Sequence, residues 1–168
     1  MTSDFKIRVA EPNIEEDDAK AVYKAVKEKC LSGSGPYNKQ FEKNFAEYIG
    51  TKYAVAVNSG TAALHLSLEV LGIRDGDEVI TTPFTFAATS NVIIMQNAKP
   101  IFVDIEPETF NLDPLKIESA ISSKTKAIMP IHYAGQPCEM DAINEIAKQH
   151  NLYVIEDAAP AVGSTYKG

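Results

Sequence analysis

Apolar residues recur at helical spacing in the first third of the chain. Along the segment 15–30 they stand three or four positions apart, at Ala19, Val22, Val26 and Cys30, which predicts an amphipathic helix with these residues on one face. The acidic run 15–18 suits the positive end of that helix. A second helix carries Phe41, Phe45 and Tyr48 or Ile49 and is expected to end at Gly50. The Gly- and Ser-rich residues 31–36 predict a loop between the two helices.

Short, continuous apolar runs alternate with helical stretches in the rest of the chain. The strand-like runs are 53–57, 78–81, 100–104, 127–132 and 152–155, and the helical stretches are 61–71, 86–96, 114–121 and 140–150. Asp113 followed by Pro114 is typical of a helix start. Continuous apolar strands that alternate with helices predict an α/β fold, in which helices cover both faces of a mostly parallel central sheet.

Polar residues follow the ends of four predicted strands, at 58–61, 82–86, 132–135 and 157–160. Parallel sheets bind ligands at the carboxyl ends of their strands, so these segments are expected to approach one pocket. The run from Asn58 to Leu64 turns from a strand through Ser-Gly-Thr into a helix, whose first N–H groups can hold a phosphate. Asp157 ends another strand. A phosphate site together with a carboxylate suggests pyridoxal phosphate, which has both a phosphate and a cationic ring nitrogen.

Each of these signals also has a purely structural explanation. Ser or Thr after a strand often only caps a helix, and an aspartate at a strand end often caps a loop. The chain has no Gly-x-Gly-x-x-Gly fingerprint after its first predicted strand and no phosphate loop that ends in Gly-Lys-Ser/Thr. Gly33-Ser34-Gly35 lies between helices and is interpreted as a flexible connection.

Composition narrows the class of protein. The chain has 168 residues, 45% of them apolar, enough for one domain of ordinary size. Its net charge of −7 disfavours nucleic acid as a partner. Cys30 and Cys138 lack metal-ligand spacing and fit a reducing cytoplasm, and the three histidines are too scattered to suggest a metal site. We expect a soluble, cytoplasmic protein, because residues 1–6 show no signal peptide and no apolar run is long enough to span a membrane.

Taken together, these motifs resemble the DegT/DnrJ/EryC1/StrS sugar aminotransferases, enzymes of fold type I that use pyridoxal phosphate. The resemblance runs from about Arg8 to Gly168. Six segments carry it, in the right order: Asn58–His65, Gly76–Ile80, Thr82–Phe86, Pro130–Gln136, Met140-Asp141 and Glu156–Ala159. Two helices before the first strand also disfavour a flavodoxin-like binding domain.

The resemblance implies roles for particular residues. The phosphate of the cofactor would bind the backbone N–H groups of Gly60, Thr61 and Ala62 and the hydroxyl of Thr61. Phe86 would stack on the pyridine ring, although the residue pattern alone favours a core position for it. Asp157 would pair with the protonated ring nitrogen and keep the ring cationic.

Pro160 and His132 are two further positions that the family resemblance bears on. Many relatives have a glutamine at the position of Pro160 that reaches the ring oxygen of the cofactor, so here that contact is either lost or made by water or backbone. His132 is interpreted as structural rather than as a general acid or base. The resemblance places no catalytic residue and no metal ligand in this chain.

The resemblance also predicts the organisation of the chain. Residues 1–50 would form the N-terminal helices and an active-site loop, and residues 51–168 the first part of the large cofactor-binding domain. The lysine that links to the cofactor, and the small C-terminal domain, would lie beyond Gly168. Lys167 precedes the true lysine position. The chain is therefore expected to be a fragment or one part of a split enzyme, inactive alone.

The resemblance implies transfer of an amino group to a nucleotide-linked keto-deoxysugar, with glutamate as the expected donor. The expected partners are therefore a nucleotide sugar and an amino acid. A dehydratase of the same fold and a truncated non-catalytic paralogue remain alternatives. The family also implies a homodimer, and the loop 31–38 would reach toward a neighbouring subunit's pocket.

Overall fold

The computed structural model describes residues 11–168, which form two compact units, one ending at Ala56 and one beginning at Val57. The expectation that residues 1–6 contain no signal peptide, and the start of the family resemblance at Arg8, lie outside the described residues. No helix between residues 11 and 168 has the length and apolar character needed to cross a bilayer.

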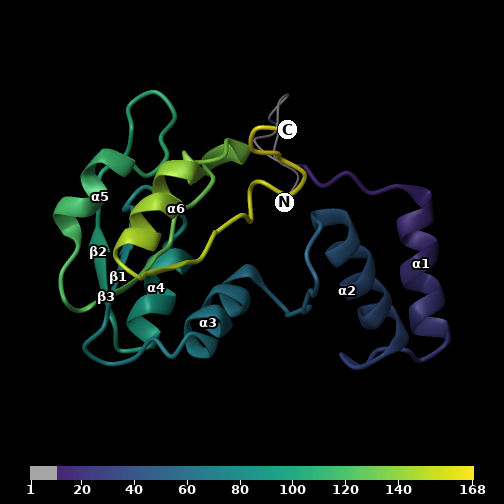
Figure 1. The fold of residues 1–168 in the computed structure, drawn as a ribbon. Coiled ribbons are helices and arrows are strands. Elements are labelled where there is room, and N and C mark those ends of the chain that lie inside the picture. The colour runs from purple at the N-terminus through teal and green to yellow at the C-terminus, as the bar shows by residue number, and fades with distance from the viewer. Residues whose placement is uncertain (1–10) are drawn as a thin grey trace, which may run out of the picture. The chain divides into compact units, whose positions relative to one another are not determined.

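The first unit consists of two helices, α1 (Glu16–Lys27) and α2 (Pro36–Ile49), which confirms both predicted helices (Figure 1). The first turn of α1 is acidic, and the carboxylate of Asp18 accepts a hydrogen bond from the N–H of Glu15 at 2.8 Å. At the end of α2, Gly50 has φ of +80° and donates its N–H to the carbonyl of Ala46. A left-handed glycine of this kind ends a helix at little cost, as expected.

The strand predicted at 53–57 is wrong. Within residues 11–168 no strand pairs with this segment, and the side chains of Tyr53 and Val55 are 74% and 72% exposed. A strand needs hydrogen-bond partners along its edge, and the N–H of Ala56 instead donates to the carboxylate of Glu42 at 2.9 Å. The apolar run correctly indicated an extended segment, but an apolar run alone does not specify a neighbour.

The second unit is built on a sheet of four parallel strands in the order β2-β1-β3-β4. The strands are β1 (Glu78–Thr81), β2 (Lys99–Phe102), β3 (Thr125–Ile128) and β4 (Tyr153–Val154). The helices between them are α3 (Gly60–Val70), α4 (Ala87–Met95), α5 (Pro114–Ala120) and α6 (Met140–Gln149), with a short 3-10 turn, η1 (Tyr133–Gly135). These four strands and four helices confirm the alternation predicted from residue 61 onward, with shorter strands than expected (Figure 1).

Helices cover both faces of the sheet, as predicted. Successive strand residues point to opposite faces, so Val79 and Ala127 pack in one buried cluster, while Ile80 and Ile128 pack in another. The first cluster contains side chains of α3 and α4, among them Leu68 and Ile93, and its side of the sheet is called the α3/α4 face. The second contains side chains of α5 and α6, and its side is called the α5/α6 face.

Candidate active site

The ladder between β3 and β4 continues past the strands and fixes Asp157 at the carboxyl end of the sheet. Ile131 and Asp157 form a parallel bridge. The N–H of Asp157 donates to the carbonyl of Pro130 at 2.9 Å, and the N–H of His132 donates to the carbonyl of Asp157 at 3.2 Å. The backbone of Asp157 is thus as firmly held as a residue inside the sheet.

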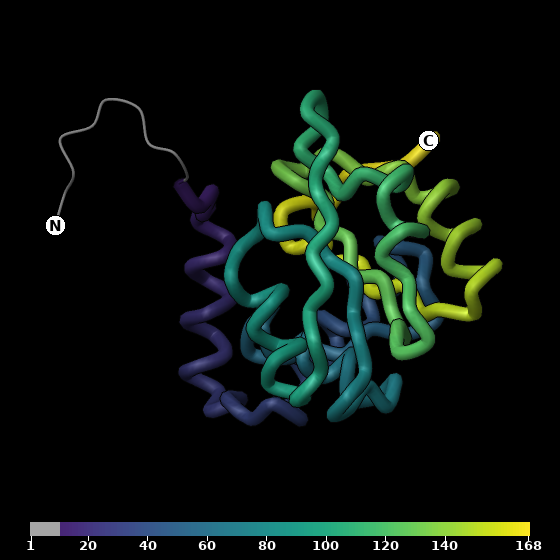
Figure 2. Tube along the Cα trace, turned by 90° about the vertical axis from the view of Figure 1, so that its left-hand side faces the viewer, coloured from purple at the N-terminus to yellow at the C-terminus, as the bar shows by residue number. Residues whose placement is uncertain are grey.

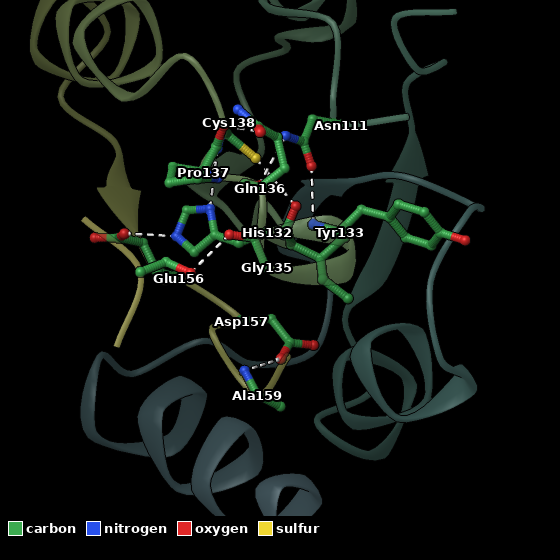
Figure 3. Close-up of polar contacts among 12 residues, drawn as sticks. Asn111, His132, Tyr133, Gly135, Gln136, Pro137, Cys138, Glu156, Asp157 and Ala159 are labelled. Atoms are coloured by element: carbon green, nitrogen blue, oxygen red, sulfur yellow. Dashed lines mark hydrogen bonds and ion pairs between the residues drawn. The ribbon is translucent and has the colours of Figure 1, made fainter. Parts of the chain in front are cut away.

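Strand alternation sends the two neighbouring carboxylates to different faces. Val154 packs in the cluster of the α5/α6 face and Ile155 in that of the α3/α4 face. Glu156 and Asp157 continue the alternation, and Figure 3 shows Glu156 directed to His132 while Asp157 points away from that ring. The α3/α4 face therefore receives Asp157.

Asp157 is 6% exposed, and both carboxylate oxygens accept a hydrogen bond. Oδ2 accepts from the hydroxyl of Thr89 in α4 at 2.7 Å, and Oδ1 accepts from the N–H of Ala159 at 3.4 Å. Among residues 11–168, no lysine, arginine or histidine forms an ion pair with it. A buried carboxylate is costly without a cation nearby, so this arrangement suits a positively charged ligand.

The start of α3 offers hydrogen-bond donors to the same region. Ser59 caps the helix: its hydroxyl accepts from the N–H of Ala62 at 3.1 Å, and its carbonyl accepts from the N–H of Ala63. Within the described chain, no acceptor takes the N–H groups of Gly60 and Thr61. The capping interpretation of Ser-Gly-Thr therefore holds for one donor, and two donors remain for an anion.

These groups meet in one pocket of about 230 Å³. Its lining brings together five of the six residues that the sequence predicted, which are Gly60, Thr61, Phe86, Asp157 and Pro160. Ala62 is not in that lining and instead borders a separate hollow beside Val57 and His65. The pocket thus joins residues almost a hundred positions apart in the chain.

Phe86 stands at the start of α4 and is 78% exposed. The core position that the residue pattern favoured for it is therefore wrong. The reason is its location, since Phe86 precedes the first turn of α4 while Val92 and Ile93 supply the buried side of that helix. An exposed aromatic ring on the pocket wall is a surface on which a flat ligand can stack.

His132 has both ring nitrogens engaged (Figure 3). Its Nδ1 accepts from the N–H of Cys138 at 3.1 Å, so its Nε2 is the nitrogen that donates to the carboxylate of Glu156, at 2.8 Å. This hydrogen bond lowers the pKa of Glu156 below its ordinary value of 4.5. His132 is 5% exposed, and these contacts support its interpretation as a structural residue.

Cys138 belongs to the same closed network. Its thiol donates to the carbonyl of Ile131 at 3.0 Å, and it is fully buried. Burial raises the pKa of the Cys138 thiol from 9.0 to about 12. A thiol with that pKa is neither a nucleophile nor a metal ligand at neutral pH, and within residues 11–168 no group of three or more metal-ligating side chains occurs.

A projecting loop is tied to this network by one buried amide. The loop 105–112 extends beyond the carboxyl end of β2 and doubles back, with a bridge between Ile105 and Leu112 (Figure 2). The amide of Asn111 donates to the carbonyls of Gln136 and Pro137 and accepts from the N–H of Tyr133. Three half-exposed rings, those of Phe84, Phe110 and Tyr133, pack together beside it with centroids 4.9–5.8 Å apart.

Sequence reasoning missed two residues that shape the site. Thr89 contacts Asp157 but lies 68 positions away, inside a stretch whose apolar character indicated only a helix. Glu156 was noted only as part of a motif, although it holds His132. The sequence signal that could have found Thr89 is its position, since it is a hydroxyl residue three positions after Phe86 and therefore one helical turn away.

Comparison with known proteins agrees with this geometry. The family model of the DegT/DnrJ/EryC1/StrS aminotransferases matches residues 12–168. GDP-perosamine synthase of Caulobacter vibrioides is 48% identical over 163 residues, which are 97% of this chain and 44% of that protein. The chain thus belongs to the DegT/DnrJ/EryC1/StrS aminotransferase family.

Solved structures show the same fold. An aminotransferase from Psychrobacter cryohalolentis superposes with a TM-score of 0.90 at 43% identity, covering 94% of this chain and 40% of that one. NtdA from Bacillus subtilis, with bound cofactor PMP (pyridoxamine phosphate), superposes with a TM-score of 0.84 at 41% identity, covering 90% of this chain and 36% of that one. The fold is therefore that of the aminotransferase large domain, as predicted. The chain spans about 40% of the length of the curated relatives it matches.

Proposed function

We propose that this chain forms part of a sugar aminotransferase and that its pocket binds pyridoxal phosphate. The observation that carries the proposal is the meeting of three features in one pocket of about 230 Å³. They are two N–H groups without an acceptor among residues 11–168, an exposed aromatic ring, and a buried carboxylate that no cation in those residues pairs with. Each matches one part of the cofactor: phosphate, ring face and ring nitrogen. The bound cofactor supplies an electron-withdrawing ring that makes a substrate C–H bond easier to break.

The residues of the pocket bind and orient the cofactor in this proposal. The N–H groups of Gly60 and Thr61, with the Thr61 hydroxyl, hold the phosphate at the positive end of α3. Ala62 supports that turn through its bond to Ser59 rather than by direct contact. Phe86 covers one ring face and Asp157 holds a proton on the ring nitrogen. Pro160 lines the wall without a side-chain donor, so it can contribute only shape there.

The substrates are proposed from the names of the relatives. The acceptor is a nucleotide-linked keto-deoxysugar, because a 48% identical relative is named GDP-perosamine synthase. The amino donor is glutamate, as the family resemblance implies. The chain contributes one part of the site, and the rest of the enzyme supplies the groups that move protons.

Binding of 4-deoxypyridoxine 5′-phosphate tests the cofactor site directly. This analogue lacks the aldehyde and cannot link to a lysine, so its affinity reports only phosphate and ring contacts. We expect micromolar binding by calorimetry, weakened at least tenfold by Asp157→Asn. The matched control is Glu156→Gln, which neutralises the neighbouring carboxylate on the other face. Equal effects of the two substitutions would contradict the proposed ring position.

Amino transfer is tested in the natural full-length polypeptide that contains this sequence. We expect the oxo acid of the donor to appear when glutamate and a nucleotide-linked 4-keto-6-deoxysugar are both supplied, as measured by coupled absorbance and mass spectrometry. Loss of a hydroxyl from the sugar without incorporation of nitrogen would identify a dehydratase instead.

We also propose that the active enzyme is a symmetric dimer. No residue of α1 is buried, and Val22 and Val26 on its apolar stripe are 65% and 56% exposed. Such a stripe suits a self-complementary interface. The predicted loop 31–38 overlaps the first turn of α2, so only residues 31–35 form a loop, and Asn38 of α2 donates to the carbonyl of Gly33 in it. In this proposal that loop reaches toward the partner's pocket. Light scattering of the full-length protein tests this, and an active monomer would contradict it.

A further inference from the structure

We propose that Thr89 is a positioning residue that holds the Asp157 carboxylate toward the pocket, and that Thr85 completes a hydroxyl chain behind it. This inference rests on the proposed cofactor site. Thr89 is fully buried, and its hydroxyl lies 2.7 Å from Oδ2 of Asp157. The hydroxyl of Thr85 lies 2.8 Å from that of Thr89.

The count of protons gives these hydrogen bonds a direction. An ionised carboxylate only accepts, so Thr89 must donate its single hydroxyl proton to Asp157. The oxygen of Thr89 is then the acceptor of the bond with Thr85, which donates. Hydrogen bonds in such a chain polarise one another, and a bond to a charged acceptor is stronger than a neutral one. The two hydroxyls therefore hold the Asp157 carboxylate in one orientation, toward the ring nitrogen that it pairs with in the proposed site.

Helix α4 links this function to ring stacking. Thr89 stands three positions after Phe86, and its N–H donates to the Phe86 carbonyl at 3.1 Å, in the first turn of the helix. One turn thus carries the exposed ring on the pocket wall and the hydroxyl that orients the carboxylate. A shift of α4 would move both together, which keeps the stacking surface and the charge partner in register.

The test uses Thr89→Val, which keeps the shape and removes the hydroxyl, and Thr89→Ser, which keeps the hydroxyl. Thr81→Val is the matched control. The Thr81 hydroxyl is equally buried, but it donates to the carbonyl of Met129 rather than to a residue of the pocket. In the full-length protein, 4-deoxypyridoxine 5′-phosphate labelled with ¹⁵N in its ring reports ring protonation by its chemical shift across a pH titration.

We expect Thr89→Val to lower the pH at which the bound ring loses its proton by about one to two units, because a carboxylate that is no longer held toward the ring nitrogen stabilises the ring proton less. Affinity should fall about tenfold. Thr89→Ser and Thr81→Val should titrate like the unmodified protein. A Thr89→Val protein with an unchanged ring titration and affinity would overturn the proposal.

Crystal structures of the variants without cofactor separate this inference from the proposed function. A displaced Asp157 carboxylate in Thr89→Val, with the original position in Thr89→Ser, would support the positioning function whether or not the analogue binds. An unmoved carboxylate in Thr89→Val would overturn it. Failure of the unmodified protein to bind the analogue would instead overturn the cofactor site.

Discussion

Glu156 and Asp157 are neighbours in the chain, yet the structure gives them opposite surroundings. On the α5/α6 face, Glu156 meets His132, whose other nitrogen is engaged by Cys138, so both ring nitrogens of His132 have a partner within the protein. On the α3/α4 face, Asp157 has hydrogen bonds but no ion pair with any residue between 11 and 168, and it faces a pocket. The difference shows that a buried charge marks a binding site when the protein satisfies its hydrogen bonds but leaves its charge unbalanced.

The same contrast holds for the residues around each carboxylate. The network of the α5/α6 face connects loops to one another and to the amide of Asn111, which ties the projecting loop 105–112 to the strand ends. The groups of the α3/α4 face include Phe86, which is 78% exposed, and the N–H groups of Gly60 and Thr61, which have no acceptor in the described part of the chain. The polar contacts of the first face connect protein groups to one another, whereas the groups of the second line a pocket.

The largest expected effect is on the reactivity of the Cys138 thiol, which lies on the α5/α6 face. At pH 8 a thiol with a pKa of about 12 is almost entirely protonated. We therefore expect Cys138 to react with iodoacetamide on the order of a thousandfold more slowly than an ordinary cysteine thiol. Peptide mass spectrometry measures this, with denatured protein as the control in which Cys138 becomes reactive. Rapid labelling in the folded protein would show that this face is open.

Asp157→Asn should lower kcat/KM of the full-length enzyme by at least about a hundredfold, or roughly 3 kcal/mol of transition-state stabilisation. Asparagine fills the same space but cannot keep the ring nitrogen protonated. Glu156→Gln on the other face should change kcat/KM by less than about threefold. Thermal melts check that both variants fold. Comparable losses of activity would remove the distinction between the two carboxylates.

Phe86→Ala should weaken cofactor binding about threefold to tenfold, because stacking contributes about 0.5–1.5 kcal/mol beyond buried area. The free energy of unfolding without cofactor should change by no more than about 0.5 kcal/mol, since the ring is 78% exposed. A buried ring would cost about 3–5 kcal/mol. Denaturation with and without the analogue measures both quantities, and a large loss without it would return Phe86 to the core.

The smallest expected effect concerns the pH dependence of folding. Hydrogen bonding to His132 lowers the pKa of Glu156 in the folded protein below its ordinary value of 4.5. The stability that this bond contributes is therefore present above about pH 4.5 and is lost as pH falls through the lowered folded pKa. Because the side chain is 52% exposed, solvent limits the effect to less than about 1 kcal/mol. Urea titrations between pH 3 and 6 should show a shallower slope for Glu156→Gln.

The sequence by itself determined the α/β alternation, the end of α2 at Gly50, the start of α5 after Asp113, and the family. These features depend on local chemistry: a left-handed glycine ends α2, and the Asp113 side chain accepts from the N–H of Leu115 at the start of α5. The strand ends of a parallel sheet lie at one edge, so the sequence also predicted that the segments 58–61, 82–86, 132–135 and 157–160 approach one pocket. Three of the four line the pocket, and 132–135 does not.

Only the tertiary structure decided where each side chain lies and what it contacts. An apolar run does not show whether a neighbouring strand exists, so the segment 53–57 was wrongly predicted to be a strand. An aromatic residue at the start of a helix gives the same sequence pattern whether it is buried or exposed, so Phe86 was wrongly assigned to the core. Strand alternation makes the face of Asp157 depend on a register that a shift of one residue would reverse. The contact of Thr89 with Asp157 spans 68 positions and exists because α4 packs on that face. Such contacts depend on how helices pack against the sheet, and no local sequence pattern predicts that packing.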